Sequence, residues 1–117
     1  MSKSRKLLNE LEQIEEMANA IQKYTGLPGT VYFCTKEELK NPQAHSLGRV
    51  KWMYAGHETY LTIKPDKDGK RIGDGDPRMI AELERFVKKN EDLLWQYWNT
   101  PSHEADSAET IKNFQKV

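Results

Sequence analysis

Apolar residues near the start of the chain recur at helical spacing. Five of them, three or four residues apart, form one stripe of an amphipathic helix: Leu7, Leu11, Ile14, Ala18 and Ile21. The pattern predicts a long helix over residues 3–25, which Gly26 and Pro28 would end. We expect the stripe to pack on the domain's own sheet; a homodimer formed through this helix is the alternative.

Further along the chain the pattern changes to that of strands. Residues 30–35, TVYFCT, are β-branched and aromatic, which is typical of a strand. Residues 48–64 predict a hairpin, with Gly56 in the first position of a type II′ turn. This turn would pair Tyr54 with Thr59. It also separates an apolar face from a polar one. The apolar face carries Val50, Trp52, Leu61 and Ile63, and the polar face carries Arg49, Lys51, Thr62 and Lys64.

The last third of the chain returns to helical spacing. Asp76 and Pro77 are an N-cap and a first-turn proline, so a helix should begin there. The apolar phase changes near Asn90, which predicts a helix pair over residues 77–99. The polar residues 101–117 are expected to form a flexible or weakly helical tail.

Together these elements predict an α+β fold with two layers. We expect the long N-terminal helix, an antiparallel sheet of three to four strands within residues 30–64, and the C-terminal helix pair. A single domain would span residues 1–100, because the chain of 117 residues has the usual length of one domain.

Composition narrows the possible partners and compartments. The chain has 18 Lys and Arg against 18 Asp and Glu, so no global field attracts it to nucleic acid or to an anionic membrane. The charged N-terminus is unlike a signal peptide, and no run is apolar enough to span a bilayer. A single cysteine, Cys34, cannot form an internal disulfide. The cytoplasm is the expected compartment.

No combination of residues predicts a reaction. His45 and His57 flank the predicted hairpin, but no CxxC, HxH or HExxH spacing accompanies them. The loop DKDGKRIGDGD lacks the glycine and glutamate spacing of a calcium-binding EF-hand. Cys34 lies within a predicted strand, where a small buried residue is expected. We therefore predict no metal, no cofactor and no catalytic residues.

Two groups of residues are candidates for binding. Apolar and aromatic side chains on the helices predict a protein-binding surface, since Trp and Tyr are enriched in binding hot spots. This first group is Leu7, Leu11, Trp95, Tyr97 and Trp98. The alternative is an RNA-binding or nuclease-like site on the polar side of the hairpin, whose affinity would fall with salt. This second group is His45, Arg49, Lys51, His57 and Lys64.

Four motifs resemble those of a family of small bacterial proteins known only as a domain of unknown function. The segments are NPQAH (41–45), YAGHE (54–58), GDP (75–77) and NEDLLWQYW (90–98), within residues 28–99. The family pattern has Asn-Pro-Pro-His-x-His, whereas this chain has Gln43 and Leu47 at the second proline and second histidine. The resemblance implies a bacterial or phage origin and a protein partner in a toxin–antitoxin-like pair. A phage-type inhibitor of a host protein would also fit a small non-enzymatic binding module.

Overall fold

The computed structural model describes residues 17–39 and 45–117 of the chain. Its five strands form one antiparallel sheet in the order β1-β2-β3-β4-β5. The strands are β1 (Ala18–Ile21), β2 (Thr30–Phe33), β3 (Val50–Tyr54), β4 (His57–Leu61) and β5 (Gly73–Asp74). The helices are α2 (Gln22–Thr25), the 3-10 helix η1 (Lys36–Glu38), α3 (Pro77–Lys89), α4 (Glu91–Asn99) and α5 (Ser107–Lys112).

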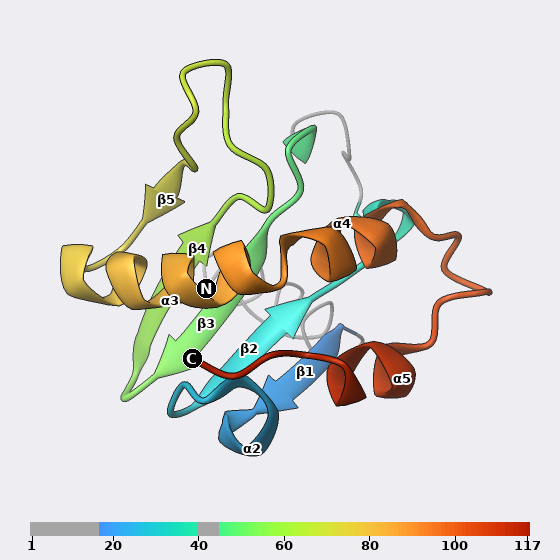
Figure 1. Cartoon of the computed structure of the whole chain (residues 1–117), viewed down its shortest axis with the longest axis horizontal. Helices are drawn as coiled ribbons and strands as arrows, with labels where there is room; N and C mark the ends of the chain where they lie inside the picture. Colours follow the sequence, from blue (N-terminus) through green and yellow to red (C-terminus); the bar gives the residue numbers. More distant parts are fainter. Residues whose placement is uncertain (1–16, 40–44) are drawn as a thin grey trace, which may run out of the picture.

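The helices α3, α4 and α5 cover one face of this sheet, as Figure 1 shows. The apolar side chains that alternate along the strands point towards them, so the core lies between the two layers. Val31, Trp52 and Leu61 are each at most 1% exposed. The predicted α+β class is therefore confirmed. We call the opposite side of the sheet, which carries Thr30, Arg49, Lys51 and Tyr60, the outer face.

The hairpin β3–β4 keeps the predicted faces but not the predicted pairing. Tyr54 pairs with His57, and Val50 pairs with Leu61. The turn is Ala55-Gly56, and both residues have positive φ, 51° and 79°. This is the backbone of a type I′ turn, not the expected type II′ turn. The register moves by an even number of residues, so the paired side chains stay on their predicted faces. Lys64, beyond the end of β4, lies beside α4 instead.

The predicted helix over residues 3–25 is wrong at residues 18–21. Residues 18–21 form β1, which pairs with β2 so that Ala20 lies opposite Val31. Only Gln22–Thr25 are helical, and Gly26 ends that turn with a φ of 81°. Pairing with β2 buries Ala20 against the core, and this tertiary contact outweighs the helical spacing. The earlier part of the predicted helix, and with it the proposed dimer contact, lies outside the described residues.

The sheet has five strands rather than three or four, because β1 and β5 extend it at both edges. The C-terminal helix pair, in contrast, is confirmed. Asp76 caps α3 by accepting hydrogen bonds from the backbone N–H groups of Arg78 and Met79, at 2.8 and 3.4 Å. Asn90 separates α3 from α4.

The segment that follows α4 is packed against the core. Phe114 is 8% exposed, and its ring centroid lies 5.3 Å from that of Phe33 and 5.2 Å from that of Phe86. The backbone N–H of Val117 donates to the carbonyl oxygen of Thr25 over 3.0 Å. The sequence predicts a flexible or weakly helical tail here, and the structure has the short helix α5. The same segment also contributes an aromatic side chain to the core.

Within the described part of the chain, the helices are too short or too polar to cross a lipid bilayer.

Candidate functional site

The aromatic group predicted to bind a protein lies mostly in the core. Trp98 is 2% exposed and Tyr97 is 7% exposed, and the Tyr97 ring packs edge-on against Phe33 at 4.8 Å. Trp95 is half-buried. Leu7 and Leu11 lie outside the described residues. Of this group, only Trp95 offers a described surface to a partner, and its binding role stays a prediction.

The residues of the predicted RNA-binding group do not lie together in the structure. Lys64 lies beside α4, where its Nζ is 3.1 Å from Oε2 of Glu91 and 5.6 Å from the centre of the Trp95 ring. Arg71 binds the other oxygen of Glu91 and donates through Nε to the carbonyl of Ile63 over 2.9 Å. Lys64 is therefore part of an ion-pair cluster that joins the loop after β4 to α4.

We expect this cluster to stabilise the fold less as the pH falls. Burial alone would raise the pKa of Glu91, but hydrogen bonds to and charges on Lys64 and Arg71 outweigh it and lower the pKa. A carboxyl group whose pKa is lower in the folded than in the unfolded protein stabilises the fold at pH values above its unfolded-state pKa. This stabilisation is lost as the pH falls through the folded-state pKa. Glu91→Gln should therefore lower the free energy of unfolding at about pH 7 and have little effect at about pH 2.

Denaturant unfolding of both proteins at the two pH values measures this difference. Glu82→Gln is the control, because Glu82 is exposed on α3 and makes no ion pair with the described residues. An equal loss at both pH values would contradict the assigned role of the carboxylate.

His57 lies far from His45, and Lys51 is already bound to a carboxylate. His57 is exposed at the hairpin tip, at the opposite end of β4 from the residues near His45. Lys51 is on the outer face but only 4% exposed, with its Nζ 3.3 Å from Oε1 of Glu58. The structure thus brings His45 and Arg49 together, and separates Lys64 and His57 from them.

His45 and Arg49 meet because the chain turns sharply just before β3. The backbone N–H of Gly48 donates to the carbonyl of His45 over 2.8 Å. Gly48 has a φ of 68°, and a Cβ there would lie 2.8 Å from Cδ1 of Ile63, so both the backbone conformation and the limited space favour glycine. Arg49 directly precedes β3, and its side chain lies over Tyr60 on the outer face.

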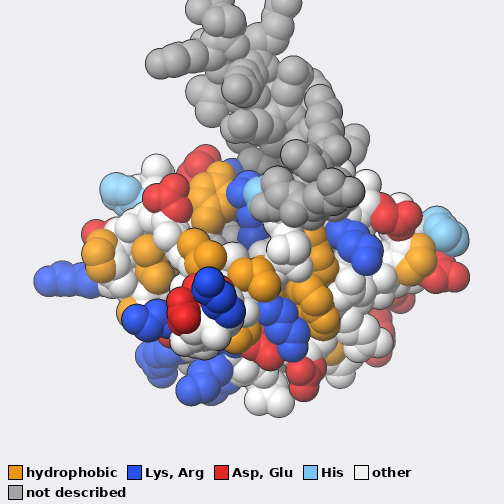
Figure 2. All heavy atoms as spheres, turned by 90° about the horizontal axis from the view of Figure 1, so that it is seen from above, with side chains coloured by type: hydrophobic (Ala, Val, Ile, Leu, Met, Phe, Trp, Pro, Cys, Tyr) orange, Lys and Arg blue, Asp and Glu red, His pale blue; other side chains and the backbone are white. Residues whose placement is uncertain are grey.

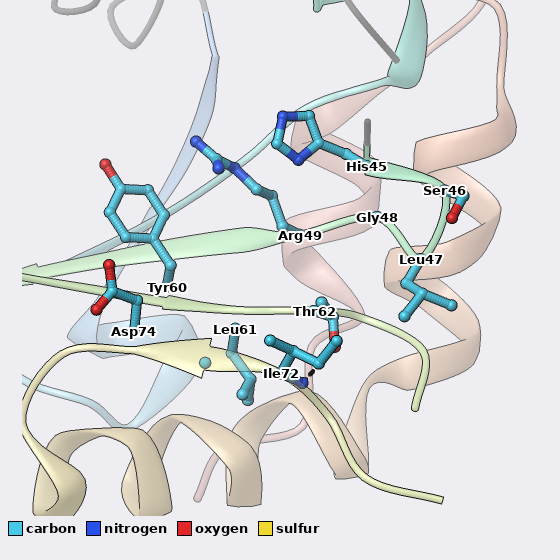
Figure 3. A pocket seen from close by; sticks show the side chains of 11 residues that line it. His45, Ser46, Leu47, Gly48, Arg49, Tyr60, Leu61, Thr62, Ile72 and Asp74 are labelled. Carbon is cyan, nitrogen blue, oxygen red and sulfur yellow. Dashed lines mark hydrogen bonds between the residues drawn. The ribbon is translucent and has the colours of Figure 1, made fainter. Parts of the chain in front are cut away.

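A hollow of about 370 Å³ lies between this turn, β4 and β5. Its size is within the range of sites that bind small ligands or single side chains. Figure 3 shows Arg49 and His45 on one side of it and Tyr60, Thr62, Ile72 and Asp74 on the strands below. Leu47 and Leu61 add apolar surface to the wall. The floor is fixed by two hydrogen bonds that join Thr62 to Ile72, at 2.9 and 3.0 Å.

Arg49 has an unusual position in this hollow. It is half-buried, and its guanidinium carbon lies 4.6 Å from the centre of the Tyr60 ring. In Figure 3 the guanidinium lies beside that ring, and the Asp74 carboxylate lies below the ring. Among the described residues, no carboxylate forms an ion pair with Arg49, whereas Lys51, Lys64 and Arg71 each have one.

The neighbouring surface carries both signs of charge. Figure 2 shows Lys and Arg side chains interspersed with Asp and Glu, with hydrophobic side chains between them. Ile72 is 57% exposed at the edge of the hollow. The site therefore combines a cation that forms no direct ion pair within the described residues with an exposed apolar side chain.

The hollow lacks the geometry of an acid–base pair within the described chain. Burial and the nearby charge of Arg49 lower the pKa of His45, so its imidazole is neutral at pH 7. None of the described carboxylates or hydroxyls is hydrogen-bonded to that imidazole to orient it. Metal binding has no support here either, because no three His, Cys, Asp or Glu side chains of residues 17–39 and 45–117 gather as ligands.

Cys34 is equally unsuited to nucleophilic chemistry in the folded state. It is 2% exposed, and burial together with the charge of Glu38 raises the pKa of its thiol to about 12, against an opposing effect of Arg49. A reactive cysteine needs a depressed pKa and access to its substrate. Cys34 thus behaves as a small core residue, as the sequence predicts.

No family model, no curated protein and no solved structure matches this chain. The resemblance over residues 28–99 therefore depends on its four motifs alone.

Sequence reasoning proposed His45 and Arg49 but missed most of the hollow. Tyr60 and Asp74 lie on β4 and β5, and Thr62 and Ile72 lie directly beside these strands; the sequence does not predict β5. The exposed isoleucine within the charged loop was the available signal, because an apolar side chain in such a loop suggests a contact.

Proposed function

We propose that this chain is a non-enzymatic protein-binding module, and that the hollow and Ile72 form its contact surface. The observation that carries the proposal is Arg49, a half-buried cation without a carboxylate partner among the described residues. Arg and Tyr are enriched at protein interfaces, where a buried centre is surrounded by polar groups.

The surrounding charges favour a protein partner over RNA. A polyanion needs several cations that are free to contact successive phosphates. Lys51 and Lys64 are bound to Glu58 and Glu91, and Asp74 lines the hollow itself. The basic face proposed from the sequence is thus too strongly neutralised to support the RNA alternative.

The resemblance to the bacterial family adds a suggestion about the partner. It would be the other member of a toxin–antitoxin-like pair; a host protein inhibited by a phage product fits the same surface. Both versions require the surface beside β5 to contact one defined protein.

Site-specific photo-crosslinking tests this proposal in the source cell. We expect p-benzoyl-phenylalanine at position 72 to give one discrete crosslinked protein on irradiation, because Ile72 is exposed beside the hollow. The matched control carries the same group at position 81, where Ala81 is exposed on α3, away from the hollow. The product should be absent there.

The identified product should also be lost when Arg49→Gln is combined with the group at position 72. Identical products from positions 72 and 81, or no product from position 72, would contradict a contact surface at β5.

A further inference from the structure

The hollow also has a specific chemical preference. We propose that it receives the carboxylate of an aspartate or glutamate side chain from the partner protein, held by Arg49, while an adjacent apolar residue of the partner packs on Ile72. This inference rests on the proposed protein-binding function and names the chemistry that the partner must supply.

The first step is the charge at Arg49. Its guanidinium carbon lies 4.6 Å from the centre of the Tyr60 ring, a cation–π contact that leaves its N–H donors without a hydrogen-bond acceptor among the described residues. An Arg guanidinium presents a planar fork of donors that matches a carboxylate. Because the group is already half-buried, a carboxylate placed there would form its hydrogen bonds partly shielded from water.

The second step concerns how many negative charges a group bound in the hollow can carry. Asp74 lines it, and Glu58 lies nearby as the partner of Lys51. Because His45 is neutral at pH 7, Arg49 is the cation available in the lining. One carboxylate can pair with Arg49 alone, whereas a chain of phosphates would extend to Asp74 and Glu58 and be repelled by them.

The third step is the apolar surface. Leu47 and Leu61 contribute to the wall, and Ile72 is 57% exposed at its edge. A free small acid would fill the hollow and leave Ile72 in water. An acidic residue with an apolar neighbour in one peptide segment would satisfy Arg49 and cover Ile72 together.

Selection from a library of random heptapeptides tests this chemistry without a known partner. Peptides enriched on the immobilised wild-type chain should share an Asp or Glu next to an apolar residue. One such peptide is then synthesised, together with its Glu→Gln or Asp→Asn form, and both are titrated against wild type and Arg49→Gln.

The four affinities form a double-mutant cycle for the two charged groups. We expect Arg49→Gln to weaken the acidic peptide about 10- to 100-fold, and to change the affinity of the amide form little. Arg49→Lys should give an intermediate loss, because it keeps the charge but not the planar fork. Arg85→Gln, an exposed change on α3, is the control. Circular dichroism establishes that each variant folds.

The inference would be overturned if no peptide is enriched, or if the enriched peptides share no acidic residue. It would also be overturned if Arg49→Gln weakens binding of the acidic and amide peptides equally, or if N-acetylglutamate alone binds as tightly as the peptide. Binding of poly-uridylate that depends on Arg49 would overturn it in favour of RNA. Photo-crosslinking at position 72 reports separately on the proposed function, because a non-acidic partner would still give a crosslinked product there.

Discussion

Phe114→Ala is expected to lower the free energy of unfolding by about 3–5 kcal/mol, the usual cost of removing a buried phenylalanine side chain. Phe114 is 8% exposed and packs edge-on against both Phe33 and Phe86. These partners belong to the sheet and to α3, so the ring joins the two layers. The substitution removes apolar area and leaves a cavity between them.

Urea unfolding followed by tryptophan fluorescence measures this loss. Gln115→Ala is the matched control, because Gln115 is exposed and its hydrogen bonds to Asn90 use backbone atoms only. It should change stability by less than about 0.5 kcal/mol. A loss below about 1 kcal/mol for Phe114→Ala would mean that this segment does not pack in the core in solution.

Asn90→Ala is the second change with a large expected effect, a loss of about 2–3 kcal/mol. Asn90 is 3% exposed, and its side chain bonds the end of α3 to the C-terminal segment. Its Nδ2 donates to the carbonyls of Phe86 and Gln115, both at 2.9 Å, and its Oδ1 accepts from the N–H of Gln115 at 2.8 Å. Alanine would leave the backbone N–H and carbonyl of Gln115 without this partner, whereas the Phe86 carbonyl would still accept from the backbone N–H of residue 90.

The control is Asn113→Ala, the same chemical change at an exposed position on the C-terminal segment. It should cost well under about 1 kcal/mol, because water replaces its hydrogen bonds to Glu109. Asn90→Ala and Phe114→Ala both release the C-terminal segment, so the double variant should lose less stability than the sum of the two. Strict additivity would argue against a shared role.

The elements that could be predicted from sequence are those fixed by local chemistry. Asp76 and Pro77 mark the start of α3 because the cap and the proline act within one helical turn. The faces of the hairpin follow from side-chain alternation, and an even shift in register leaves them unchanged. The exact pairing depends on whether Ala55 or Gly56 is the first residue of the turn. Ala55 takes this position with a positive φ, which is rare for alanine, so the sequence favours Gly56 instead.

The elements that failed are those decided by distant contacts. Residues 18–21 have helical spacing, yet pairing with β2 makes them a strand. Trp98 and Tyr97 were candidates for a surface because composition alone does not tell a core aromatic from an exposed one. Phe114 enters the core through contacts with residues 28 and 81 positions earlier in the chain, Phe86 and Phe33. Within the candidate site, His45 and Arg49 could be proposed from one short segment, whereas Ile72 and Asp74 join them only through β5.

The order of strands in the sheet has a consequence during synthesis on the ribosome. Each strand neighbours the next one in the chain, so the ladder from β1 to β5 can pair step by step as the polypeptide emerges. Its apolar face, however, has no cover until α3, α4 and the stretch through Phe114 have left the exit tunnel. A nascent chain halted after β5 would expose that apolar face to solvent or to a chaperone, and the emergence of α3, α4 and the stretch through Phe114 would cover it.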